Sequence, residues 1–444
     1  LCSERTDKRR QRSFHETAVA LAADSAVTIS AGSKEDKIFD TADKLFELSN
    51  HNAIGIMIYN NMSFMEAPLP SLIRAFRAQC DEANCVEDAA KGFLEFLHNF
   101  GKQAGERVRN DAVGAIISPF VHAVHNRAFA RFQNKVMDDE QLEQDPRQLL
   151  EGFIDSELNR LDKILKVYDN AEFVGGKSIR FTKPRAEYLR KTIETYLPLS
   201  TDDQKDRMLQ IVKSALGKAY VSSGKTGIIV AGFGAGDLFP TLVSYEIDGM
   251  IWDRLKFIQT NHIDIDRDGH KARVLPFAQK EMVERFLYGL DDGIQQNITT
   301  YCRESLPDIR KVMLKHVEFQ DEEDRGSLEK KARRAESEFT KGLNKKAFDK
   351  IRTESQAEIE DMVEFMPKPE MAKMAEALVN LTSIKRRVSR GMETVGGPID
   401  VAVISQSEGF VWVRRKHYFP AELNGRYFER MKTSVQKGSG VANA

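Results

Sequence analysis

Two oppositely charged residues, Asp24 and Lys44, stand at the ends of short apolar runs that the sequence predicts to be strands. Side chains at strand ends can project into a shared cleft, where a carboxylate and an ammonium shift each other's pKa. Such a pair suits a site that handles protons. The alternative interpretation is an ordinary ion pair, or two separate surface charges.

Three parts of the chain hold the elements that would position this pair. Residues 17–100 read as strands followed by a helical hairpin. Residues 223–300 begin with two strands around a glycine-rich turn, and Asp248-Gly249 is expected to close that hairpin. Residues 369–430 hold a long helix and a closing pair of strands.

Two charged, helical blocks separate these parts, at residues 101–222 and 301–368. Residues 178–182 look like a strand that interrupts the first block. In the second, residues 321–360 are so charged that they form either an exposed helical arm or a partly disordered segment. Residues 1–16 are a basic segment without periodicity, and residues 431–444 are expected to be a flexible tail.

The composition limits the classes of function. The 66 basic and 67 acidic residues nearly cancel, which argues against a general nucleic-acid or membrane-surface binder. No apolar run approaches the roughly 20 residues of a transmembrane helix. The basic start and the following alanine-rich run are a poor match to an export signal. Four cysteines make no disulfide framework. We therefore expect a cytoplasmic protein that needs no cofactor.

Three loops and one histidine pair look like binding motifs but lack an essential part of each. The segment 224–226, Gly-Lys-Thr, follows a helix and precedes a strand, which reverses the order of a phosphate-binding loop. The glycine-rich 232–236 segment also precedes a strand. The segment 264–269 begins like a calcium loop, but Leu275 stands where a glutamate is needed. His122 and His125 lack a third metal ligand. The preferred interpretation is therefore a structural turn for each of the three loops and an exposed helix surface for the two histidines.

Several segments together resemble proteasome β subunits and their bacterial peptidase relatives. AVALAADSAVT, DKLFELS and GIMI, followed by two helices, resemble the first half of such a subunit. TGIIVAGFGAGDLFPTLVSYEIDG is similar to the family's central hairpin. AEALVNLTSIKRRVSRGMETVGGPIDVAVISQSEGF is similar to its last helix, Gly-Gly turn and closing hairpin. The resemblance covers residues 17–100, 224–300 and 369–416.

This resemblance implies an α+β fold, a four-layer αββα sandwich of the N-terminal-nucleophile (Ntn) hydrolase class with two large helical insertions. In that class a processed N-terminal residue attacks an amide carbonyl, and its own α-amino group is the base. An α-amine has a pKa near 8, which suits this role near neutral pH. The resemblance assigns Lys44 as the electrostatic activator and Asp24 as the residue that orients it.

Other positions depart from the family pattern. Lys8 stands at the nucleophile position, with Thr6 and Cys2 as the nearby candidates after trimming. Tyr59 replaces the glycine whose N–H forms the oxyanion hole. Pro276-Phe277-Ala278-Gln279 replaces a supporting Ser-Gly-Ser turn. Met392 replaces a supporting aspartate, with Glu393 adjacent.

Two hypotheses follow from this mixture of matches and departures. The first is a proteasome-like threonine peptidase or amidohydrolase that acts on protein or peptide substrates as a homo-oligomer, either a ring or a dimer. The second is a catalytically inactive assembly protein that binds partner proteins through its helical insertions.

Overall fold

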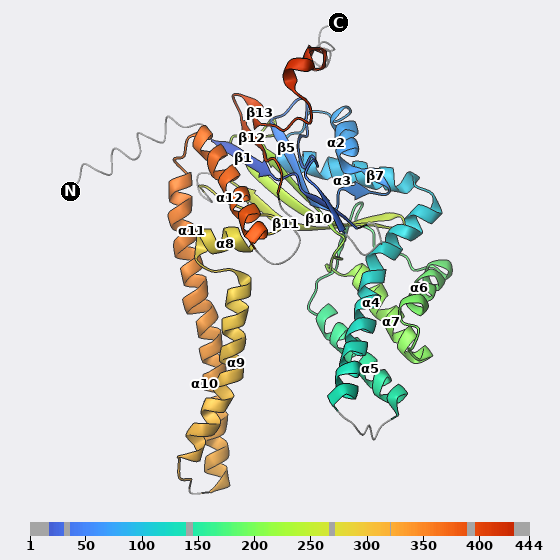
Figure 1. Ribbon diagram of the computed structural model, residues 1–444, viewed down its shortest axis with the longest axis vertical. Coiled ribbons are helices and arrows are strands. Elements are labelled where there is room, and N and C mark those ends of the chain that lie inside the picture. Colours follow the sequence, from blue (N-terminus) through green and yellow to red (C-terminus); the bar gives the residue numbers. More distant parts are fainter. Residues whose placement is uncertain are drawn as a thin grey trace, which may run out of the picture.

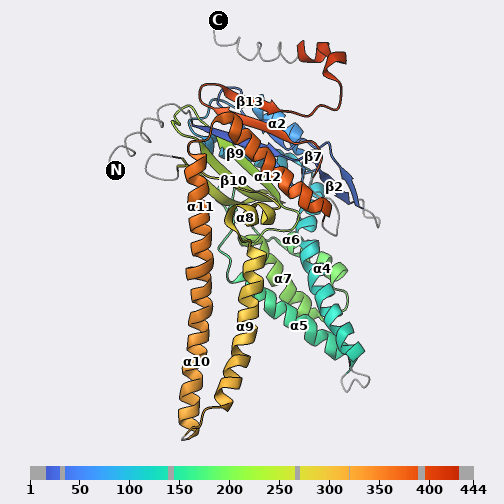
Figure 2. The same cartoon turned by 60° about the vertical axis from the view of Figure 1, so that its left-hand side comes forward.

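The computed structural model describes residues 17–30, 36–138, 145–265, 271–319, 321–388 and 396–429. The protein is a mixed α+β protein with 55% helix and 18% strand, which confirms the expected α+β class. The strands gather at one end, and two groups of helices extend from them in the same direction (Figures 1 and 2).

Six strands form the larger sheet, in which every neighbouring pair is antiparallel. All seven residues of its β9 strand are buried, because both faces of the sheet are covered at that point. In spatial order the strands are β4 (Leu45–Glu47), β5 (Ile54–Asn60), β9 (Thr226–Gly232), β10 (Thr241–Ile251), β11 (Arg254–Asp264) and β8 (Glu172–Phe173).

Two local predictions about strands are wrong. Asp248 and Gly249 do not close a hairpin, because β10 continues to Ile251 and the turn follows at Trp252. The strand register shifts at a bulge beside Gly249. Gly249 has a φ of 114°, a backbone conformation that is strained for a residue with a β-carbon. Residues 178–182 are not a strand.

Three strands form the smaller sheet, in the order β1 (Ala18–Ala23), β12 (Asp400–Ser405) and β13 (Gly409–Arg414). β1 pairs antiparallel with β12, from Ala18 opposite Ser405 to Ala23 opposite Asp400. The first and last parts of the described chain therefore meet in one sheet. Two short pairs complete the strands: β2 (Val27–Ser30) with β3 (Asp36–Phe39), and β6 (Ser63–Phe64) with β7 (Ala67–Pro68).

Apolar clusters join the sheets to each other and to helices. Leu21 and Ile404 of the smaller sheet share a cluster with Ala231 of the larger one. On the other side of the smaller sheet, α12 (Lys368–Val388) packs against β1 and β12 through Ala372 and Val379. α2 (Leu69–Arg77) and α3 (Val86–Gln103) share a separate cluster with β5, β9 and β10.

Four helices of the first helical block form a core of their own. They are α4 (Glu106–Asp138), α5 (Pro146–Leu165), α6 (Lys183–Tyr196) and α7 (Asp202–Gly217). Their buried residues cluster with Ile251 and Trp252 at the β10–β11 turn, which attaches this helical unit to the larger sheet. At the start of α7, Thr201 and Gln204 form a capping box that satisfies two helix-end N–H groups.

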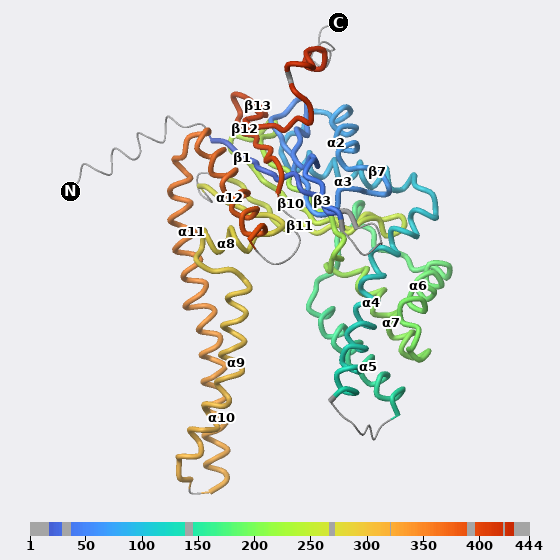
Figure 3. The backbone as a smooth tube through the Cα atoms, viewed as in Figure 1, coloured from blue at the N-terminus to red at the C-terminus, as the bar shows by residue number. Residues whose placement is uncertain are grey.

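The second helical block forms a long arm. Of the two alternatives for residues 321–360, an exposed helical arm or a partly disordered segment, the structure has the exposed helical arm. After α8 (Glu281–Tyr288), the arm runs out along α9 (Asp292–Lys315) and returns along α10 (Glu322–Gly342), a π-helical turn (Leu343–Phe348) and α11 (Asp349–Val363). Figures 1 and 3 show α9 and α10 side by side. α10 and α11 have no buried residue among those described, so the arm is a solvated hairpin.

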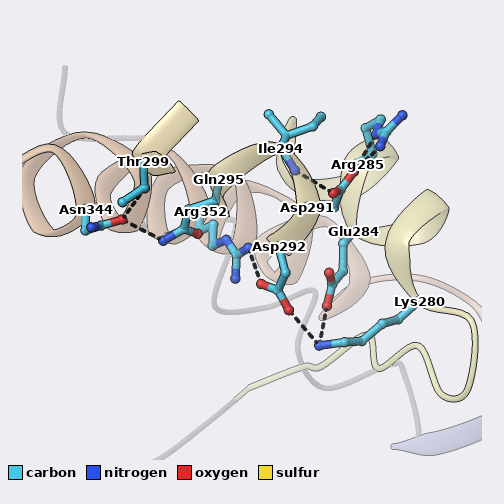
Figure 4. Close-up of polar contacts among 10 residues, drawn as sticks. All are labelled: Lys280, Glu284, Arg285, Asp291, Asp292, Ile294, Gln295, Thr299, Asn344 and Arg352. Atoms are coloured by element: carbon cyan, nitrogen blue, oxygen red, sulfur yellow. Dashed lines mark hydrogen bonds and ion pairs between the residues drawn. The ribbon is translucent and has the colours of Figure 1, made fainter. Parts of the chain in front are cut away.

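A polar network fixes the base of the arm (Figure 4). Asp292, at the start of α9, accepts hydrogen bonds from Arg352 of α11 at 2.7 Å and from Lys280 at 3.3 Å. Thr299 donates to Asn344 of the π-helical turn at 3.3 Å. These contacts hold the outgoing helix α9 against the returning helical segment at the base of the arm.

Candidate functional site

The structure brings Asp24 and Lys44 together. Asp24 follows the last residue of β1, and Lys44 precedes the first residue of β4. The Lys44 ammonium lies 2.7 Å from Asp24 Oδ1, and the two side chains are 13% and 16% exposed. Asp24 and Lys44 therefore form an ion pair. Both sequence interpretations, an ordinary ion pair and a site that handles protons, include this contact.

Backbone amides hold the Asp24 carboxylate in place. Its Oδ2 atom accepts hydrogen bonds from the N–H of Ala26 at 3.2 Å and from that of Gly396 at 3.3 Å. Ser25 Oγ donates to the carbonyl of Pro398, which ties the same turn to the loop before β12. The two backbone donors and the Lys44 ammonium together fix the direction in which this carboxylate points.

A cavity of about 340 Å³ lies beside this pair, and Asp24, Lys44 and Tyr59 all line it. Its walls come from the whole of β1, the 271–279 segment, the end of α11 and the inner side of α12. Four methionines contribute to the apolar part of the wall: Met57, Met366, Met371 and Met374. Because methionine side chains are flexible and polarizable, such a wall can adapt to differently shaped apolar groups.

The Tyr59 side chain occupies the wall rather than leaving it open. A β-carbon at Gly227 would lie 1.9 Å from the Tyr59 ring, so the ring lies flat over that glycine. The ring also stacks on Phe277 at 6.3 Å between centroids, and its hydroxyl lies 3.4 Å from Glu246. Burial and then the Glu246 carboxylate raise the pKa of Tyr59, so it is a neutral phenol at physiological pH.

The backbone amide of Tyr59 has a fixed direction. Ile58 N–H donates to the Lys44 carbonyl at 2.9 Å, on the β4 side of β5. Successive N–H groups of a strand point to opposite sides, so the Tyr59 N–H points toward β9. The register there pairs Tyr59 with Gly227. Tyr59 therefore belongs to the candidate site through its side chain, as a lining residue of the cavity, rather than through its amide.

The 276–279 segment, which stands in place of a Ser-Gly-Ser turn, also lines the cavity. Ala278 has a φ of 62°, a left-handed conformation that is uncommon for a residue with a β-carbon. Arg386 of α12 donates to the side chain of Gln279, which ties the segment to that helix. The segment forms part of the wall that faces β1.

Sequence reasoning missed a group of charged residues on the cavity wall. Arg273 lies 2.7 Å from Glu360, and Lys271 lies 3.7 Å from Glu364. Lys271, Arg273 and Glu364 line the cavity. No sequence signal marks them, because about 90 residues of charged helix separate the members of each pair.

The other predicted site residues, Cys2, Thr6 and Glu393, lie outside the described residues. Thr17, the first described residue, lines the cavity.

The rejected motifs are structural where the structure describes them. Gly224 stands in a turn before β9, and Lys225 pairs with Glu246 at 2.6 Å. In the glycine-rich segment, Asp237 accepts from the N–H groups of Gly234 and Val86, which binds the turn to α3. The described residues contain no group of three potential metal ligands. Nor do they contain a helix with the length and hydropathy of a membrane span.

Comparison of the chain with protein-family models, with curated proteins and with solved structures found no match.

Proposed function

We propose that this protein is an Ntn-type hydrolase related to proteasome β subunits, which cleaves peptide or other amide bonds. The observation that carries the proposal is the 2.7 Å contact between Lys44 and Asp24 in the wall of a 340 Å³ cavity. This is an activating lysine with an orienting carboxylate, beside a space for a substrate.

The arrangement of the clusters supports the fold that this proposal needs. One cluster lies between the two sheets, one between the smaller sheet and α12, and one between the larger sheet and the α2–α3 pair. That order is compatible with helix, sheet, sheet and helix in an αββα sandwich. α4–α7 and the α9–α11 arm then stand as the two helical insertions.

The proposed reaction is acyl transfer by an N-terminal nucleophile. After trimming, Thr6 or Cys2 attacks the amide carbonyl, and its free α-amino group accepts the hydroxyl or thiol proton. The C–N bond then breaks, the amine leaves with that proton, and water hydrolyses the resulting ester or thioester to free the acid and the nucleophile. The Lys44 ammonium favours the deprotonated nucleophile electrostatically, and Asp24 holds Lys44 in position. Thr6 lies eleven positions before Thr17, and an extended chain of that length spans about 36 Å. Chain length therefore does not prevent Thr6 from reaching Lys44.

Fluorogenic peptides and an electrophilic threonine-protease inhibitor test the proposal. The expected result is an inhibitor adduct on the N-terminal residue of a processed chain, located by mass spectrometry. Removing the Lys44 charge by Lys44→Met should lower the turnover number about 100-fold or more, as loss of a preorganised electrostatic group does in other hydrolases.

Lys225→Met is the matched control, because Lys225 also pairs with a carboxylate on the larger sheet but does not line the cavity. It should leave turnover unchanged. If every trimmed form neither cleaves peptides nor forms an adduct, the enzymatic proposal is wrong.

The second candidate, an inactive assembly protein, is favoured by the surface of the arm. Exposed apolar side chains follow α9, with Tyr301 71% and Met313 64% exposed. In this case the native protein keeps its N-terminal segment untrimmed, and Lys44→Met has no effect on its association state. Mass spectrometry of the native N-terminus, combined with turnover assays of the wild type and the Lys44 variant, separates the two candidates.

A further inference from the structure

A second cavity lies inside the helical unit α4–α7, and none of its lining residues lines the cavity beside the Asp24–Lys44 pair. Its volume is about 290 Å³. Residues of α4, α5 and α7 form most of its walls, and the 220–223 segment and Asp248 of β10 complete them. Figures 1 and 2 show these helices grouped below the larger sheet. The cavity belongs to the core of a unit that the proposed hydrolase reaction does not use.

Apolar side chains make up most of the cavity wall. Phe120 and Val124 come from α4, Leu161 and Leu165 from α5, and Val212 from α7. A closely packed helical core normally leaves few voids larger than a water molecule. A space of this size among aliphatic and aromatic side chains therefore suits a hydrocarbon group.

A cluster with surplus positive charge borders this apolar space. Glu157 of α5 is 1% exposed, and three arginines surround it. Arg160 donates to Glu157 Oε2 at 2.8 Å, Arg131 lies 3.1 Å from Oε1 without hydrogen-bond geometry, and Arg127 lies 3.9 Å away. One carboxylate thus faces three guanidinium groups. Two of them, Arg127 and Arg160, line the cavity.

One nitrogen of this cluster has no acceptor. The Arg160 Nη2 atom is buried and makes no hydrogen bond to any described residue. A buried N–H donor without a partner loses the hydrogen bonds that water would give it, so an acceptor beside it would bind favourably. A carboxylate is the acceptor that best matches a guanidinium group.

The acidic residue of the cavity does not cancel this attraction. Asp248 lies on the wall, but Lys256 contacts its Oδ2 at 3.0 Å, and Ser222 N–H donates to its Oδ1 at 2.8 Å. Its negative charge is therefore already paired with the Lys256 ammonium. The two arginines on the wall remain in excess.

We propose that this cavity binds a small apolar monocarboxylate, with its carboxylate on Arg160 and Arg127 and its hydrocarbon part among the apolar side chains. A cavity of about 150 Å³ can hold one benzene molecule, with six non-hydrogen atoms. The present volume is about twice that, so it admits roughly 12 such atoms. Octanoate, with an eight-carbon chain, falls within this limit.

Isothermal titration calorimetry with sodium octanoate tests the proposal, and octanamide serves as the neutral ligand of equal size. We expect saturable binding of one octanoate per chain and at least about tenfold weaker binding of octanamide, because a charge-assisted pair is lost. Arg160→Met, which keeps much of the aliphatic stem, should weaken octanoate at least about tenfold and leave octanamide unchanged.

Two further variants separate the site from general effects on folding. Arg147→Met removes an exposed arginine from the same helix α5 and should not change octanoate binding. Ala123→Phe places a ring in the cavity and should abolish binding of both ligands. Each variant is first checked by thermal unfolding. Equal affinity for octanoate and octanamide, or unchanged octanoate affinity in a folded Arg160→Met, overturns the proposal, as does the absence of octanoate binding.

Discussion

The buried Lys256 carries a prediction about stability that the structure makes quantitative. Its side chain is 1% exposed, and its ammonium contacts the carbonyl oxygens of Ala215 at 3.2 Å and Tyr220 at 2.5 Å, as well as Asp248 Oδ2 at 3.0 Å. Burial lowers the pKa of Lys256, and Asp248 partly offsets this effect. The charge is thus costly to bury and depends on its three partners.

Lys256→Met leaves the Asp248 carboxylate buried with the Ser222 N–H as its remaining partner. Removing one member of a buried ion pair costs about 3–5 kcal/mol, and two backbone carbonyls also lose a donor. Because a domain is stable by only about 5–15 kcal/mol, the variant should lose at least about a fifth of its stability. The double variant Lys256→Met/Asp248→Leu should be more stable than Lys256→Met, since no unpaired charge remains.

Urea unfolding at pH 7, followed by circular dichroism, measures these free energies for the wild type, both single variants and the double variant. Lys225→Met is the control, because the Lys225–Glu246 pair is more exposed and should contribute about 1 kcal/mol or less. A loss below about 1 kcal/mol for Lys256→Met, or a double variant whose loss equals the sum of the single losses, would refute the reasoning.

Three further predictions concern single side chains. The buried hydroxyl of Tyr245 has no hydrogen-bond partner among the described residues, so Tyr245→Phe should stabilise the protein by about 1 kcal/mol in urea unfolding at pH 7. Burial raises the pKa of Tyr245 to about 12, above its unfolded value of 10.0; stability from this group is present below pH 10 and is lost as pH rises toward 12. The advantage of the phenylalanine variant should therefore widen above pH 10, and a constant difference would contradict the assignment. Gly227→Ala should cost about 1–3 kcal/mol through overpacking against Tyr59, and the added variant Tyr59→Ala should recover part of it; a neutral Gly227→Ala would show that the ring moves freely. Thr201→Ala, which removes the capping box of α7, should cost about 1 kcal/mol, measured by thermal unfolding, and no loss would mean that the cap is redundant.

Local patterns predicted the elements whose burial follows directly from their own residues. The apolar runs at β9 and β12 were recognisable because both faces of those strands are covered. The end of β10 was not, because Asp248 and Gly249 have the composition of a turn. The strand continues because Asp248 pairs with Lys256 of the neighbouring strand β11, and a bulge at Gly249 lets the β10–β11 pairing run on to Ile251.

The candidate site divides in the same way. The sequence placed Asp24 and Lys44 at strand ends, and the two strands bring these ends within 2.7 Å. It gave no sign of the cavity walls from α11 and α12, or of the Arg273–Glu360 ion pair. Charged residues on helices are ordinary surface residues until a distant segment packs against them.

By itself the sequence determined the α+β class, the strand ends that carry Asp24 and Lys44, and the helical character of both charged blocks. These depend on periodicity and on short-range preference, which act within a few residues. The tertiary structure alone decided which residues enclose the two cavities, which charged groups are buried, and that three arginines surround a single carboxylate. Those properties arise from contacts between segments tens to hundreds of residues apart, and no local pattern encodes them.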